Sequence, residues 1–215
     1  MRNYHIRYLI ILLFLWPAFC IHSQVILTAD AGYSYRLMLT PDSSSSSYSS
    51  YFNKKRPGIN FNGEIAYYSE NQGIGFRYNS FINKVSGKSV EVSNILKVDK
   101  SENIQINYYS IQYHKRRVFN KSKLSTGFCF GLGYVKYLNT GKEAAEEIDL
   151  NGTTYGLNVA LSLEYKIYKH LSFHISPNFF MAVLSQYLEN GNTVTLKKKE
   201  SLTRLDTNFG VNFIF

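Results

Sequence analysis

The sequence predicts an all-β fold: an eight-stranded antiparallel up-and-down transmembrane β-barrel, preceded by a cleaved signal peptide. Apolar and polar residues alternate with a period of two almost everywhere after Gln24, as strands require. The last segment, 205–215, has one aromatic-rich face and one polar face, and it ends on Phe215. The connections between the alternating segments are long and short in turn. Both features are typical of barrels that face lipid outside and polar groups inside.

The first 23 residues have the composition of a secretory signal peptide. Arg2 and Arg7 precede an apolar run, Tyr8–Phe19, and Ile21, His22 and Ser23 then precede Gln24. The run is shorter than the ~20 residues that a membrane-spanning helix needs. A lipid anchor on Cys20 is not expected, because Phe19 stands where a lipoprotein signal needs a small residue. The barrel domain is therefore predicted over 24–215.

Removal of this peptide has two consequences for the mature chain. It leaves Cys129 as the one cysteine, so no intramolecular disulfide can form. It also removes two arginines, and the net charge falls from +9 to +7 (9 − 2).

The first four strands are predicted over 27–39, 59–67, 74–82 and 104–113. In the fourth, apolar residues at 104, 106 and 108 give way to apolar residues at 109, 111 and 113. Such a change of phase predicts a β-bulge at Tyr108–Tyr109.

The remaining four strands are predicted over 124–134, 155–167, 171–183 and 205–215. Pro177 interrupts the seventh, and because proline cannot donate to the ladder, a bulge is expected there. The last strand is expected to pair with the first and close the ring.

The connections divide into two classes. Residues 40–57, which include the serine run Ser43–Ser47, and 86–102, 139–152 and 187–202 are long, whereas 70–73, the turn around Asn120, and 169–170 are short. Long loops are predicted on the extracellular side and short turns on the periplasmic side. Asn94–Lys100 and Thr193–Lys197 are able to form strands, so some loops are expected to extend the sheet and expose an edge to a partner.

Residues 155–173 and 192–215 resemble the small outer-membrane β-barrel proteins of Bacteroidetes-type bacteria. The resemblance implies a location in the bacterial outer membrane and no particular activity. It also implies that the barrel-assembly machinery recognises the terminal aromatic residue, Phe215.

Several charged residues are predicted to face the lumen. They are Asp30, Arg36, Glu64, Arg77, Glu164, Lys166, His174, Arg204 and Asp206. The interior of an eight-stranded barrel is just wide enough for side chains to fill, and buried charges must pair. We expect the ion pairs Glu64–Arg77 and Glu164–His174, within a polar plug that closes the lumen. A narrow or gated channel for small solutes is the alternative.

No catalytic, cofactor or metal site is predicted. His170 and His174 lie ~13 Å apart on a strand at ~3.3 Å per residue, too far to share an ion. A lipid-A-modifying enzyme remains an alternative, but His114, His170 and His174 fall toward the periplasmic end, away from outer-leaflet lipid.

The predicted role is therefore structural or interactive. Lys197, Lys198 and Lys199 are expected at headgroup level, where they would attract phosphates of outer-membrane lipid. The long loops are expected to contact an extracellular protein or surface ligand, and no nucleic acid partner is expected.

Overall fold

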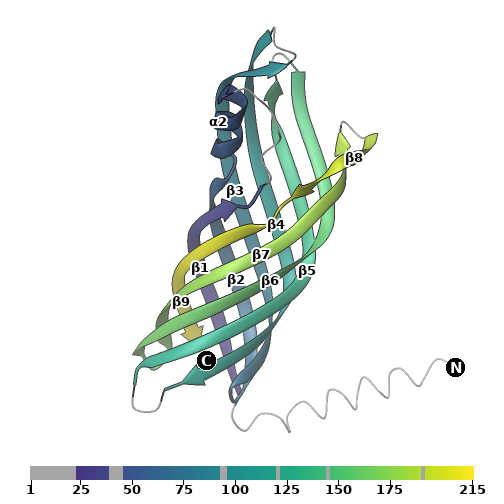
Figure 1. Cartoon of the computed structure of the whole chain (residues 1–215). Helices are drawn as coiled ribbons and strands as arrows, with labels where there is room; N and C mark the ends of the chain where they lie inside the picture. Colours follow the sequence, from purple (N-terminus) through teal and green to yellow (C-terminus); the bar gives the residue numbers. More distant parts are fainter. Residues whose placement is uncertain (1–22, 39–45, 93–95, 120–121, 144–145, 190–191) are drawn as a thin grey trace, which may run out of the picture.

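The computed structural model describes residues 23–38, 46–92, 96–119, 122–143, 146–189 and 192–215, which form a tilted β-barrel (Figure 1). Apart from Ser23, the predicted signal peptide lies outside the described residues. No helix in these ranges is long and apolar enough to cross a membrane.

The described chain forms nine strands and one helix. They are β1 Ser23–Arg36, α2 Ser46–Lys54, β2 Pro57–Ser69, β3 Gln72–Val92, β4 Leu96–Val118, β5 Leu124–Glu143, β6 Glu146–Tyr168, β7 Leu171–Glu189, β8 Asn192–Ser201 and β9 Arg204–Ile214. The last two strands both pair with β7, on either side of a break at Leu202–Thr203. They act as one wall strand, so the wall has the predicted eight positions.

The ring closes between β9 and β1, as predicted, with Ile26 opposite Ile214 and a hydrogen bond from the Phe215 amide to the Val25 carbonyl (2.9 Å). A path from each residue to its partner on the next strand leads once around the wall. It starts at Val25, returns to the same strand at Tyr35, and passes in between through Tyr67, Ile74, Tyr113, Phe130, Val159, Phe179 and Leu205. The stagger is therefore ten residues (35 − 25) over eight strands, which fits strands tilted by about 40°.

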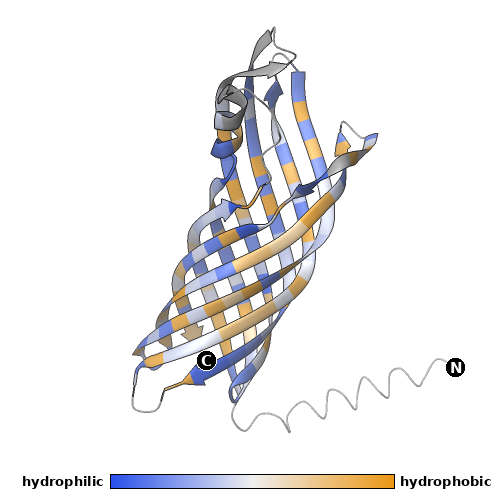
Figure 2. Ribbon diagram, in the orientation of Figure 1, coloured by the Kyte–Doolittle hydropathy of each residue, from blue (hydrophilic) through white to orange (hydrophobic). Residues whose placement is uncertain are grey.

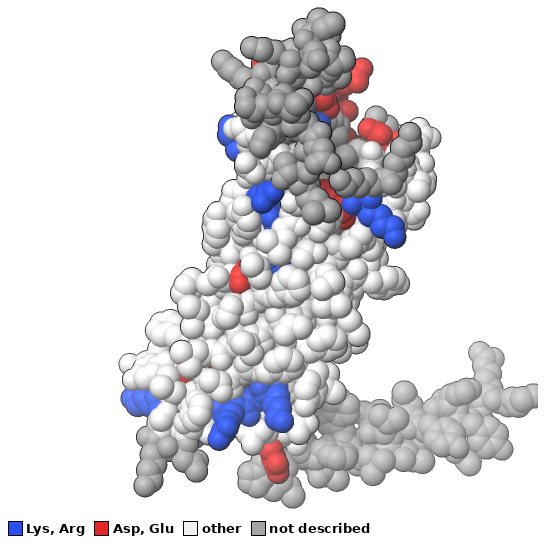
Figure 3. All heavy atoms as spheres, in the orientation of Figure 1, with Lys and Arg blue, Asp and Glu red and all other residues white. Residues whose placement is uncertain are grey.

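Apolar and polar residues alternate along the strands (Figure 2), and the exposed large apolar side chains form a belt on the outer face of the wall. On β9, outward residues from Leu205 to Phe215 span ten steps, which at ~3.4 Å each and a tilt of about 40° gives a height of about 25 Å. The upper part of the belt carries a row of paired tyrosines, namely Tyr78, Tyr109, Tyr134 and Tyr155. In the view of Figure 3, charged side chains gather at the two ends and leave the middle largely uncharged.

The predicted bulge at Tyr108–Tyr109 is wrong. Both residues pair in continuous register with β3 and β5. The pattern changes because the surroundings of the strand change. From Tyr109 downward, the outward residues of β4 face lipid and are apolar. Above Tyr109 the outward residues, such as Asn103 and Gln105, are polar. There the apolar side chains Ile104, Ile106 and Tyr108 point inward and are buried.

The predicted bulge at Pro177 is also wrong. Pro177 pairs with Thr207 of β9, and on the other side the pairs Ala160–Asn178 and Leu163–Ile175 share one register. The ladder to β6 is interrupted between these pairs, and no register shift occurs there. A missing N–H removes a hydrogen bond without requiring an inserted residue.

Three of the predicted long loops are instead mostly strand. The hairpins β3–β4, β5–β6 and β7–β8 continue above the belt, and they include the described parts of Asn94–Lys100 and Thr193–Lys197. Most of the serine run lies outside the described residues, but Ser46 begins helix α2. This helix packs on β3 at the upper end of the barrel (Figure 1).

Candidate functional site in the barrel lumen

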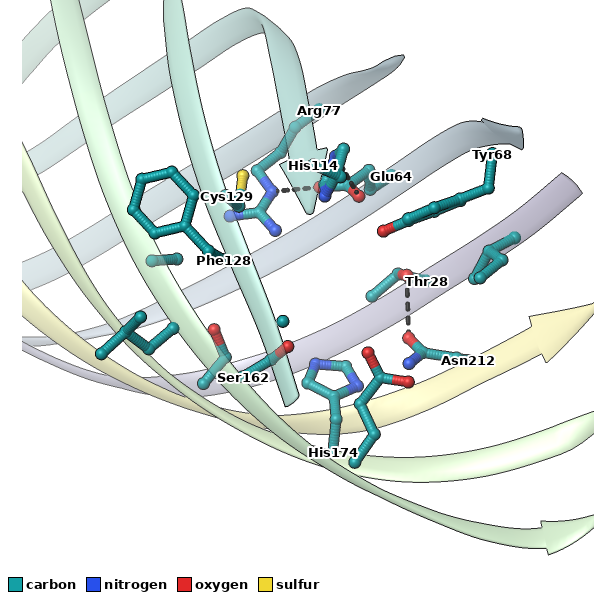
Figure 4. A pocket seen from close by; sticks show the side chains of 16 residues that line it. Thr28, Glu64, Tyr68, Arg77, His114, Phe128, Cys129, Ser162, His174 and Asn212 are labelled. Atoms are coloured by element: carbon teal, nitrogen blue, oxygen red, sulfur yellow. Dashed lines mark hydrogen bonds and ion pairs between the residues drawn. The ribbon is translucent and has the colours of Figure 1, made fainter. Parts of the chain in front are cut away.

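The predicted Glu64–Arg77 ion pair is present in the lower lumen. Arg77 Nε lies 2.6 Å from Glu64 Oε2, and both side chains are buried. These residues are direct cross-strand partners on β2 and β3, which is why their side chains meet inside the barrel. The second carboxylate oxygen lies 3.1 Å from His114 Nε2 on β4, so Glu64 bridges two basic groups (Figure 4).

The predicted Glu164–His174 pair does not form, although the two residues are cross-strand partners. Glu164 instead accepts hydrogen bonds from Arg116 (2.8 Å) and Ser125 (3.3 Å). His174 lies 3.3 Å from Asp30 on the other side of the barrel seam. A guanidinium is always charged and a histidine is not, so Arg116 is the stronger partner for Glu164.

A second group of predicted residues forms a polar layer higher in the lumen. Asp206 accepts hydrogen bonds from Arg204 (3.0 Å), Ser34 (2.6 Å) and Asn178 (2.8 Å). The Arg204 guanidinium also binds Asn79 and lies 4.0 Å from the centre of the Phe180 ring. Arg36 pairs with Glu200 at 3.0 Å.

Lys166 does not join this network, contrary to prediction. It faces inward by alternation, but it lies two residues from the end of β6 that leads into the short turn to β7, and it is exposed. Burial ends at Glu164, so the Lys166 ammonium has water around it and needs no buried partner.

A small cavity lies among the lower charges. The volume that the centres of water molecules can occupy in it is about 40 Å³, which is enough for about three water molecules. Its walls include Thr28, Tyr68, Ser162, Ser176 and Asn212, together with Glu64, Arg77, His114, Glu164 and His174. One buried nitrogen, His174 Nδ1, lacks a hydrogen-bond partner among the described protein atoms, and water in this cavity would satisfy it.

Cys129 and His114 are direct cross-strand partners at this cavity. The Cys129 thiol donates to Gln112 Oε1 (2.7 Å). Among the described residues, no group of three or more His, Cys, Asp or Glu side chains could hold a metal ion. The site can therefore hold water and fixed charge, but its volume cannot admit a lipid or sugar.

Above Asp206 and around the Arg36–Glu200 pair, the lumen is filled by apolar side chains that the sequence did not assign to the interior. We call these ten residues the lumen seal: Phe81, Ile104, Ile106, Tyr108, Val135, Tyr137, Phe180, Ala182, Leu184 and Leu202. None is more than 3% exposed. The change of phase on β4 was the available signal, because it marks where the apolar face turns inward.

Helix α2 is held at the upper mouth by Glu102, another residue not predicted. The buried Glu102 carboxylate binds Tyr51 (2.8 Å), Lys55 (2.7 Å) and Asn139 (2.8 Å). Burial alone would raise the pKa of Glu102, but Lys55, Asn139 and Lys100 together hold it below its ordinary value. Burial raises the pKa of the Tyr51 hydroxyl, and the Glu102 charge raises it further.

The predicted headgroup lysines lie on β8, which continues above the belt. Lys199 is exposed, whereas the side chains of Lys197 and Lys198 lie outside the described set. Phe215, the C-terminal residue, lies at the end of the seam that carries the short turns, and it is exposed on the outer face of the wall.

Three solved structures are similar to this chain over almost its whole length. A major outer membrane protein from Thermus thermophilus has a TM-score of 0.60 at 9% identity, covering 90% of this chain and 99% of its own. OprG of Pseudomonas aeruginosa has a TM-score of 0.56 at 12% identity, with 90% and 96% covered. Neisserial surface protein A has a TM-score of 0.55 at 10% identity, with 89% and 97% covered.

No family model and no curated protein matches the sequence. At such low identity the structural likeness shows the fold, which is that of outer-membrane β-barrels. The apolar belt, the polar lumen and this likeness agree: the chain is a β-barrel protein of the bacterial outer membrane.

Proposed function

We propose that this protein is a closed, non-conducting barrel whose work is done by the part above the membrane, as a structural or interaction protein. The lumen seal carries this proposal. Its side chains come from β3, β4, β5, β7 and the β8–β9 break, so they approach the barrel axis from several sides. Tyr108 and Phe180 stack edge to face with ring centres 4.9 Å apart.

A seal of this kind opposes ion passage for two reasons. An apolar constriction excludes water, and an ion without water or a partner is very costly to bury. Below the seal, the buried Arg204 guanidinium presents a fixed cation to any entering cation. Its ion pair with Asp206 also fixes the side chains of the polar layer across the lumen.

The hairpins above the belt supply the surface for interaction. Among the described residues, β8 pairs with β7 along one edge, and no strand pairs with its other edge. An unpaired edge can add a strand from another protein. The proposed partner is therefore an extracellular protein that offers an extended segment.

The proposal includes no catalytic activity. Among the described residues, Cys129 beside His114 resembles a nucleophile and its base, and this pair borders a cavity of about 40 Å³. This cavity lies on the periplasmic side of the lumen seal. An outer-leaflet lipid could reach it only through the seal.

Liposome swelling tests the closed state. Liposomes that contain the wild-type protein should swell in arabinose no faster than empty liposomes. The double variant Phe81→Ala/Phe180→Ala, which removes two rings from the seal, should swell faster. Swelling of the wild-type liposomes would favour the narrow channel instead.

Site-specific photo-crosslinking on intact cells tests the interaction edge. A crosslinker at exposed Thr195 on β8 should give adducts with an extracellular protein, whereas one at exposed Thr140 on β5 should not. Equal yields at the two positions would count against strand addition at β8.

A further inference from the structure

A hollow on the outer side of the wall lies where the belt meets the extracellular solvent. Its volume is roughly 700 Å³, and β1, β2, β3 and α2 all contribute to it. The lower wall is apolar and open: Tyr33, Ile59 and Phe61 are 58%, 55% and 51% exposed. We call it the lateral hollow.

The pairing of the strands explains its shape. Tyr33 is opposite Ile59, and Ile59 is opposite Ile82, so three outward side chains form one row across β1, β2 and β3. Beyond this row, β2 begins with Pro57, opposite outward Tyr35, and its short side chain leaves the hollow open. The apolar row continues the lipid-facing belt, so this wall lies against acyl chains.

Two lysines close the upper side of the lateral hollow. Lys84 follows Ile82 on the outward face of β3, and Lys54 is the last residue of α2. Both are exposed, and neither forms an ion pair with any residue that the structure describes. No acidic residue is among the residues that line the hollow.

We propose that the lateral hollow binds a phosphorylated glycolipid of the outer leaflet, lipid A. The position restricts the occupant, because a surface continuous with the apolar belt faces lipid and not solvent. The side of the membrane selects the leaflet, because helix α2, which contributes Lys54 to the hollow, lies at the end opposite the short turns (Figure 1). Acyl chains pack on Tyr33, Ile59 and Phe61, and sugar phosphates meet the ammonium groups of Lys54 and Lys84. The proposal does not depend on whether the lumen conducts.

The binding of bis-phosphorylated lipid A to the folded protein in detergent provides the test. A lysine near an anionic lipid surface contributes about 1 kcal/mol, a factor of about five in Kd. We expect Lys54→Ala and Lys84→Ala each to weaken binding about fivefold, and the double variant about 30-fold. Lys136→Ala is the matched control, because Lys136 also faces outward just above the belt, beyond Tyr134 on β5.

Two further lipids separate phosphate recognition from general adhesion. Dephosphorylated lipid A should bind the wild type about as weakly as lipid A binds the double variant. Phosphatidylglycerol should compete poorly, because it offers one phosphate and no sugar. The heat-dependent shift in electrophoretic mobility verifies that each variant is folded. The proposal fails if the double variant binds within twofold of Lys136→Ala, or if phosphatidylglycerol competes as well as lipid A.

Discussion

Replacing Glu64 with glutamine is expected to be the most costly single change of charge in this barrel. Glutamine keeps the shape of the side chain but removes the charge that Arg77 (2.6 Å) and His114 (3.1 Å) share. Because the Arg77 side chain is 9% exposed, the few water molecules of the cavity replace the lost carboxylate poorly. Removing one partner of a buried ion pair costs about 3–5 kcal/mol, and we expect Glu64→Gln to lower the free energy of unfolding by about 3 kcal/mol.

Urea unfolding in lipid vesicles, followed by the shift in electrophoretic mobility, measures this loss. Glu64→Gln/Arg77→Met removes the unpaired cation as well, and we expect it to recover more than half of the loss. Exposed Glu147→Gln serves as the control and should stay within about 0.5 kcal/mol of wild type. The reasoning is refuted if Glu64→Gln costs less than about 1 kcal/mol, or if the double variant is less stable than Glu64→Gln.

Three further predictions follow from other parts of the barrel. The pKa of Glu102 is lowered in the folded state, so its contribution to holding α2 is complete above the unfolded pKa of about 4.3. That contribution is lost as the pH falls through the pKa of the folded state. Amide exchange in α2 should therefore rise in that pH window for the wild type, but it should be high at every pH for Glu102→Gln. Tyr51→Phe removes the 2.8 Å hydrogen bond to Glu102 and should weaken α2 by about 1.5 kcal/mol in the same exchange measurement, whereas exposed Tyr155→Phe should leave α2 unchanged. Gly133→Ala should lower the free energy of unfolding in urea by about 1–3 kcal/mol, because a Cβ there would overlap the Tyr109 carbonyl of the neighbouring strand. Gly63→Ala should be neutral, because a Cβ at Gly63 would have no atom within 4 Å. Equal losses of stability in the two variants would contradict the packing argument.

The sequence was sufficient to predict the wall of the barrel because alternation is a local property. The outward residues of β9 face lipid, and its inward residues Arg204, Asp206, Asn208 and Asn212 are polar, so the pattern reveals both faces without any knowledge of the neighbours. The Glu64–Arg77 pair was predictable for a similar reason, since a two-residue turn fixes which residues of β2 and β3 are opposite.

Partners across the lumen could not be predicted in this way. Glu164 binds Arg116 from β4, two strands away, and His174 binds Asp30 across β9, and both choices depend on the width and stagger of the closed ring. Glu102 likewise binds Tyr51 of α2, which is 51 residues away in the sequence. The lumen seal was missed because a change of phase at Tyr108 has two meanings, a bulge or an exit from the membrane, and the sequence alone does not distinguish them.

The central claim is that the lumen seal closes the barrel to ions, and single-channel recording in planar bilayers tests it most directly. The wild-type protein, inserted in the folded state, should show no discrete current steps over the baseline. Phe81→Ala/Phe180→Ala should show them under the same conditions, which establishes that insertion occurred. Discrete openings of the wild-type protein would contradict the closed barrel and identify a narrow channel in its place.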